Sequence, residues 1–167
     1  MGAAGDPAHI AGAEAGRLTV AGFEPQDRDF EQRIRSSFKS QRIMETIGAV
    51  LTHMAPGHVE IELQFRDSLT QQHGYVHAGI ITAIADSACG YAALSLLPAD
   101  AEVLTVEYKV NFLAPARGTR FIARGRVVRS GRTVSVCAGE VFAANAVVEV
   151  QVAMMLATII RSSKKTE

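Results

Sequence analysis

The alternation of apolar and polar residues predicts that most of this chain folds as β-strands. Between His58 and Arg66 every second residue is apolar, as in a strand with one buried face and one solvent-facing side. Four more strands are predicted further along the chain, over residues 103–113, 120–129, 133–143 and 147–160. The earlier segment 43–53 is apolar and fits either a helix or a strand.

Two of these predicted strands carry further information. Within 103–113, the alternation places the apolar residues from Leu104 to Phe112 on one face and Thr105 on the other. The segment 147–160 is apolar on both faces, so we expect it in the centre of the sheet or at an interface. Short turn segments separate the last four strands, and we expect hairpin-type connections between them.

One long segment is neither strand-like nor amphipathic. Residues 77–96 are small and apolar on all sides, which indicates a helix that is buried all round. Asp86 interrupts the apolar run, and a carboxylate in a buried helix is costly unless the protein needs it there. We therefore predict an α+β fold, in which an antiparallel sheet wraps around one long central helix, with Asp86 as the first candidate functional residue.

A second helix is predicted near the N-terminus. Residues 25–41 are highly charged, and Phe30, Ile34 and Phe38 recur every four residues, on one face of an amphipathic helix. Such an extra N-terminal helix either packs on the outside of the domain or covers a bound substrate. The sequence leaves both interpretations open.

Length and composition indicate a single domain. The 167 residues suit one core. We expect a disordered tail over 1–22, one domain over 23–160 and a frayed tail over 161–167. The 17 basic and 17 acidic residues give a net charge of zero, which argues against a nucleic-acid partner. No signal peptide or membrane span is apparent, so a cytoplasmic location is expected, and the two cysteines lack metal-type spacing.

The start of the central helix is a second candidate for a functional group, in addition to Asp86. Backbone N–H groups and the positive end of the helix dipole gather at Ala78, Gly79 and Ile80, where they can polarise a carbonyl oxygen. His77 and Asp86 are nine residues apart, about 13.5 Å along one helix, so the two ends of this stretch cannot meet within one helix. A two-fold dimer with antiparallel helices would bring Asp86 of one chain to the helix start of the other, giving two shared sites.

The same stretch resembles the hotdog-fold thioesterases of the PaaI-like (phenylacetate-pathway type) family. Their signature is His-Gly-Gly followed by an Asp nine residues after the His, which here reads His77-Ala78-Gly79 and Asp86. The resemblance covers residues 58–160 by the order of the elements. It implies the hotdog fold and an acyl-CoA thioesterase that needs no cofactor.

The resemblance also implies a role for individual residues. The backbone N–H of Ala78 is expected to bind the thioester carbonyl, and Asp86 to act as nucleophile or as general base on water. His77 is expected to orient the substrate, unless it is simply a helix-start residue. Thr105 matches a position where relatives often hold the water or the carboxylate with a hydroxyl. Gln71 stands where relatives often have Asn.

The sequence also offers candidate residues for binding coenzyme A, and it leaves two alternative functions open. Arg129 and Arg132 flank a tight turn and could bind the phosphates of coenzyme A, although a solvated hairpin fits the sequence equally well. A homo-oligomer is expected, either a dimer or a dimer of dimers. Two alternatives stay open, namely a non-catalytic acyl-CoA-binding protein of the same fold and a 3-hydroxyacyl thioester dehydratase.

Overall fold

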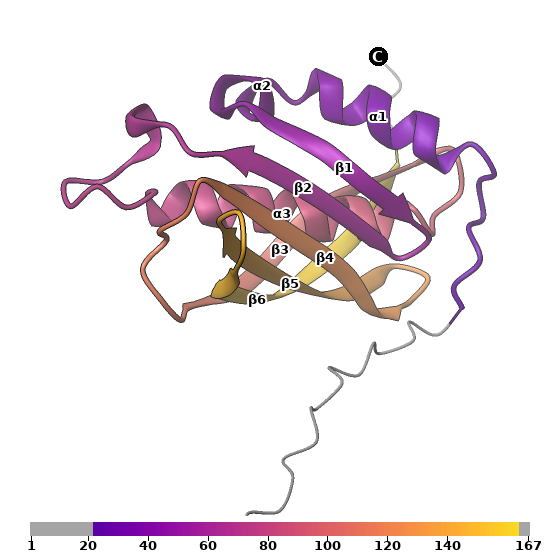
Figure 1. Cartoon of the computed structure of the whole chain (residues 1–167). Coiled ribbons are helices and arrows are strands. Elements are labelled where there is room, and N and C mark those ends of the chain that lie inside the picture. Colours follow the sequence, from indigo (N-terminus) through magenta and orange to yellow (C-terminus); the bar gives the residue numbers. More distant parts are fainter. Residues whose placement is uncertain (1–21, 164–167) are drawn as a thin grey trace, which may run out of the picture.

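The computed structural model describes residues 22–163 and shows an antiparallel sheet curled around one long helix (Figure 1). The six strands lie in the order β1-β2-β4-β5-β6-β3. The predicted N-terminal tail, apart from residue 22, and residues 164–167 lie outside the described part of the chain. The α+β hotdog architecture expected from the sequence is confirmed.

The helices and strands have the following bounds. The helices are α1 (Phe30–Ser40), α2 (Arg42–Ile47) and α3 (Ala78–Leu94), with a short 3-10 turn η1 (Asp67–Leu69). The strands are β1 (Ala49–Ala55), β2 (His58–Gln64), β3 (Ala101–Phe112), β4 (Arg120–Ser130), β5 (Val134–Ala144) and β6 (Glu149–Ser163).

Several sequence predictions agree with these elements. The apolar residues of β2 (Val59, Ile61 and Leu63) are fully buried, as their alternation requires. The ambiguous segment 43–53 contains both structures, because Gly48, with φ of +74°, ends α2 and lets β1 begin. β6 lies inside the sheet, between β5 and β3, as expected for a strand that is apolar on both faces. Its end differs from the prediction, because β6 extends to Ser163, past the predicted end of the domain at residue 160.

The expected hairpin between β3 and β4 is wrong. β3 pairs with β6 instead and forms one edge of the sheet, while β4 pairs with β2 and β5. The chain therefore crosses the sheet between β3 and β4. Local turn signals reveal where a strand ends, but they do not specify which strand it pairs with.

The central helix lies unusually close to the sheet because the strands beneath it carry glycines. A Cβ atom at Gly125 of β4 would lie 2.3 Å from the backbone carbon of Ala88, and one at Gly139 of β5 would lie 2.9 Å from the sulfur of Cys89. Cys89 and Cys137 are free, buried thiols. Burial raises the pKa of Cys137 to about 12 and raises that of Cys89 as well, so both stay protonated at neutral pH.

Helix α1 is fastened to the end of α3 by Arg33. Its guanidinium donates hydrogen bonds to the carbonyl oxygens of Leu94 and Leu97, each at 2.9 Å, and also to that of Pro98. Its Nε lies 3.3 Å from the Asp27 carboxylate, as an ion pair rather than an aligned hydrogen bond. Leu94 is the last residue of α3, and Leu97 and Pro98 follow shortly after it, so the cation lies at the negative end of that helix and fixes α1 across it.

Arg33→Met is therefore expected to lower the free energy of unfolding by about 2 kcal/mol, because it removes charged hydrogen bonds from partly buried carbonyls. Urea unfolding monitored by circular dichroism would measure the change. Arg35→Met, an exposed position on the same helix, is the matched control and should have little effect. Equal unfolding midpoints for the two variants would contradict this role for Arg33.

Candidate active site

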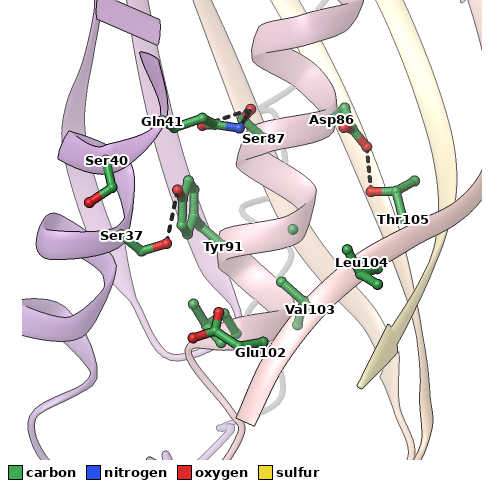
Figure 2. Close-up of a pocket in the computed structure, with 12 residues that line it drawn as sticks. Ser37, Ser40, Gln41, Asp86, Ser87, Tyr91, Glu102, Val103, Leu104 and Thr105 are labelled. Carbon is green, nitrogen blue, oxygen red and sulfur yellow. Dashed lines mark hydrogen bonds between the residues drawn. The ribbon is translucent and has the colours of Figure 1, made fainter. Parts of the chain in front are cut away.

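Asp86 lies in the middle of α3, half-buried, with its carboxylate on the side of the helix that faces β3 (Figure 2). The Thr105 hydroxyl donates a hydrogen bond of 2.7 Å to Asp86 Oδ1. Within residues 22–163 this is the only hydrogen bond that the carboxylate accepts. Oδ1 is thus fixed in orientation, and Oδ2 remains available to water or substrate.

A β-bulge lies directly after Thr105 in β3. The pairing of β3 with β6 shifts between Thr105 and Glu107, and Thr105 itself pairs with the buried Ile159 and points toward α3. Simple alternation had placed Thr105 opposite all the apolar residues from Leu104 to Phe112. Thr105 is opposite Leu104 and Val106, which are 62% and 59% exposed, but beyond the bulge Tyr108 and Phe112 lie on the same face as Thr105. The prediction is therefore wrong for the part of β3 beyond the bulge.

The start of α3 is capped by His77. Its Nδ1 accepts a hydrogen bond of 2.9 Å from the N–H of Gly79, and its carbonyl oxygen accepts one of 2.9 Å from the N–H of Ile80. Because Nδ1 is an acceptor, a neutral His77 ring carries its proton on Nε2. His77 thus combines the helix-start interpretation with a ring N–H that remains available for another partner.

The cap also identifies which amide remains available. The N–H groups of Gly79 and Ile80 are both bonded, whereas that of Ala78 has no acceptor in the part of the chain described here. Ala78 is exposed. Of the three amides expected to polarise a carbonyl, Ala78 retains that capacity, whereas Gly79 and Ile80 are occupied by bonds to His77.

Asp86 borders two hollows that lie on either side of it. The first, which we call the α1 hollow, has a volume of about 420 Å³. It lies between α1, the second half of α3 and the start of β3 (Figure 2). The second, the helix-start hollow, has a volume of about 490 Å³ and is lined by Ala78, Gly79, Thr82, Ala83, Asp86, Tyr108, Val110 and Phe112. Asp86 and Ala78 therefore share one open face of the helix, although they lie about 12 Å apart along it.

The α1 hollow has polar side chains along α1 and α3, while Leu94, Val103 and Leu104 supply apolar surface. Gln41 and Ser87 exchange hydrogen bonds of 3.3 and 3.4 Å across it, and Ser37 shares one of 3.3 Å with the Tyr91 hydroxyl. Burial raises the pKa of Tyr91, while the hydrogen bond with Ser37 acts in the opposite direction. The phenol therefore stays protonated at neutral pH and can donate a hydrogen bond.

The remaining predicted residues lie away from Asp86. Gln71 lines a smaller apolar hollow of about 180 Å³ behind the helix start, together with Ala78. Its side chain accepts a hydrogen bond from the N–H of His73, so it shapes the loop that precedes α3. Arg132 lines two hollows at the β4–β5 hairpin, whereas the exposed Arg129 lines neither.

Sequence reasoning missed three contributors. Gln41 and Ser87 were not singled out, since no local pattern shows that α1 crosses α3 at this point. Arg161, which lines both hairpin hollows with Arg132, was assigned to the frayed tail. An arginine at the very end of an apolar strand was the available signal.

The described residues were also compared with the requirements of a metal site and of a membrane-spanning helix. Among residues 22–163, no group of three or more metal-ligating side chains is close enough to hold a metal ion. In the same range, no helix has both the length and the apolar character required to cross a membrane.

Comparison with known proteins places this chain and its fold in a family. The family model described as the thioesterase superfamily matches residues 73–150. A thioesterase family protein from Silicibacter pomeroyi is 46% identical and superposes with a TM-score of 0.79, over 80% of this chain and 98% of that one. A 1,4-dihydroxy-2-naphthoyl-CoA hydrolase from Listeria monocytogenes is 24% identical, over 56% of this chain and 76% of that one.

The chain belongs to the thioesterase superfamily. The PaaI protein of the E. coli phenylacetic acid degradation operon, 18% identical, has the same fold, with a TM-score of 0.72 over 83% of this chain and 96% of that one. The resemblance to PaaI-like hotdog thioesterases is thus confirmed, and so is the prediction of a hydrolase that acts on thioesters.

Proposed function

We propose that this protein is an acyl-CoA thioesterase, which hydrolyses an acyl-CoA to the free acid and coenzyme A. The observation that carries the proposal is the Asp86 carboxylate, held at one oxygen by Thr105 at 2.7 Å and bordering two open hollows. A carboxylate fixed in this way can act as a general base on water or as the nucleophile itself.

The chemistry requires a second group that stabilises negative charge on the thioester oxygen. As water attacks the carbonyl carbon, its proton passes to Asp86 and the carbonyl oxygen becomes an oxyanion. The unbonded N–H of Ala78, at the positive end of α3, is suited to donate a hydrogen bond to that oxygen. The C–S bond then breaks, and the proton held by Asp86 passes to the departing thiolate of coenzyme A.

Ala78 and Asp86 of one chain cannot act on the same thioester, because about 12 Å of unbroken helix separates them. We infer a two-fold dimer in which each site combines Asp86 of one chain with the helix start of the other. The open face of α3 supports this arrangement. His77, Ala78 and Gly79 are exposed on it, although the surrounding helix is apolar.

Strand β3 provides a surface for the dimer. It forms an edge of the sheet over twelve residues, and Val106, Tyr108 and Phe112 on it are 59%, 45% and 50% exposed. A long, apolar, unpaired edge favours pairing with a second strand. Met154 and Leu156 of β6 are also exposed, which supports a further association of two dimers.

The phosphates of coenzyme A would be bound at the β4–β5 hairpin. Arg132 and Arg161 line two hollows of about 320 and 310 Å³, with Ser130 in one and Thr133 in the other. Arginine forks and hydroxyls suit phosphate oxygens. Arg161 pairs with Val103 across the sheet, and Val103 lines the α1 hollow, so the two regions adjoin. Arg129 is proposed as an outer contact on the same hairpin.

Arg132→Ala is expected to raise the KM for acyl-CoA about tenfold, because a charged contact to phosphate is lost. The same variant should leave the KM for the matching acyl-pantetheine, which lacks the phosphates bound by the arginines, unchanged. Steady-state kinetics with both substrates measures the difference, and Arg161→Ala should behave in the same way. An equal effect on both substrates would assign Arg132 to another role.

A panel of acyl-CoA thioesters tests the proposed function itself. Release of coenzyme A, followed with a thiol-reactive chromophore, should exceed the uncatalysed rate for at least one aryl or aliphatic acyl group. The buried thiols of Cys89 and Cys137 should contribute little background signal while the protein stays folded. If no acyl-CoA in the panel is hydrolysed, the proposal is wrong.

A further inference from the structure

The wall of the α1 hollow opposite Asp86 is built by a helix that precedes the family match. The family model matches residues 73–150, whereas Ser37, Ser40 and Gln41 come from α1 and from its junction with α2. Arg33 fixes α1 over the end of α3. The side chains on this wall can therefore act as a fixed part of the binding site.

The polarity of this wall restricts what can bind against it. Ser87 and Tyr91 are each only 7% exposed, yet both present a hydroxyl to the hollow. The two contacts between Gln41 and Ser87, at 3.3 and 3.4 Å, are long for hydrogen bonds, so a ligand can replace them at small cost. A saturated acyl chain would instead cover these groups and remove the water that solvates them, which is unfavourable.

Gly90 shows that room is left beside Asp86. It lies in the interior of α3, one turn after Asp86, where glycine is less favourable than alanine by about 1 kcal/mol. A Cβ atom built on Gly90 would meet nothing within 4 Å, and Gly90 lines the α1 hollow. The open space therefore reaches the backbone of α3.

The negative charge of the side chains that line the hollow further restricts which acyl groups can bind there. Glu102 lines it at the start of β3, and Asp86 is the second carboxylate (Figure 2). Among residues 22–163, no lysine or arginine lines the hollow. An acyl group that ends in a carboxylate would meet two like charges with no cation beside them.

We propose that the α1 hollow is the acyl-binding subsite and that Gln41 and Ser87 select acyl groups carrying a neutral hydrogen-bonding group, such as a hydroxyl. Unsubstituted and carboxylate-ended acyl groups are disfavoured. This inference rests on the proposed thioesterase function and adds the class of substrate.

Three series of acyl-CoA substrates test the inference: butanoyl-, hexanoyl- and octanoyl-CoA, their ω-hydroxy derivatives and their ω-carboxy derivatives. The wild-type protein should show a kcat/KM about tenfold higher for the best ω-hydroxy substrate than for its unsubstituted partner, as expected for one net hydrogen bond. The ω-carboxy partner should be hydrolysed more slowly than the ω-hydroxy substrate.

Substitutions then assign the preference to individual side chains. Gln41→Met keeps the length of the side chain, and it should reduce the hydroxyl preference to about twofold or less by lowering kcat/KM for the ω-hydroxy substrate. Ser87→Ala should act in the same direction and provides a second variant if Gln41→Met folds poorly. Gln64→Met, at the exposed last residue of β2, is the matched control and should keep the full preference.

The possible results separate the inference from the proposed function. Hydrolysis of all three series at equal kcat/KM would overturn the inference and leave the thioesterase function standing. A hydroxyl preference that persists in both Gln41→Met and Ser87→Ala would overturn the assignment to these residues. Hydrolysis of none of the substrates, together with none in the wider acyl-CoA panel, would overturn the proposed function and the inference with it.

Discussion

Asp86→Asn is expected to lower the turnover of the best acyl-CoA substrate at least about 100-fold, as for loss of a general base or nucleophile. The substitution preserves the size of the side chain, and the amide oxygen can still accept the hydrogen bond from Thr105 that is 2.7 Å long in the native protein. The substitution removes the negatively charged carboxylate, which would otherwise accept a proton from water or attack the thioester carbonyl carbon. Release of coenzyme A under saturating substrate measures the change.

Two further measurements make the result specific to catalysis. Asp29→Asn, at an exposed position before α1, is the same chemical substitution and should leave turnover unchanged. Asp86→Asn should also unfold at a temperature close to that of the wild type, since it keeps the packing of α3. Turnover near the wild-type value in a folded Asp86→Asn protein would remove Asp86 from the mechanism.

The part of the fold that follows from local periodicity was predictable. Alternation in β2 identified the buried face of Val59, Ile61 and Leu63, and the uniformly apolar segment identified α3. Strand pairing was not predictable in the same way, because paired residues of β3 and β6 are 41 or more positions apart in the sequence and no turn records it. Contacts so far apart in sequence depend on how the whole sheet closes around the helix.

The residues of the candidate site likewise differ in whether the local sequence could identify them. Asp86 stood out because it is the single carboxylate in an apolar helix, and the motif identified the helix start. The bulge that places Tyr108 and Phe112 on the same face as Thr105 has no signal in the alternation, since one extra residue reverses the faces of the strand beyond it. Gln41 and Ser87 meet across 46 residues, so their contact depends on where α1 crosses α3.

Activity should appear when two inactive variants are mixed, if each active site is shared between two chains. The first variant is Asp86→Asn, which lacks the carboxylate. The second is Ala78→Pro, which lacks the backbone N–H proposed to bind the oxyanion. Proline suits the first position of a helix, and His77 before it already has φ of −60° and ψ of 137°, as a residue preceding proline prefers. The second variant should therefore keep its fold.

The expected yield follows from the two-fold geometry. After complete exchange of subunits, half of the dimers contain one chain of each kind, and in these one site of two has both Asp86 and the Ala78 N–H. About a quarter of the wild-type activity should therefore return, where each parent alone has almost none. Ala78→Val, which adds bulk but keeps the N–H, is the control for the shape of the proline ring and should retain activity as a homodimer.

Exchange must be verified separately, by co-purification of an untagged chain with a tagged one. If mixed dimers form and no activity returns, then every site is built within a single chain. The α3 helix would have to break between Ala78 and Asp86 for that to happen, because its continuous turns hold the two residues about 12 Å apart. Returned activity near one quarter would place Asp86 and the Ala78 N–H of different chains at the same thioester.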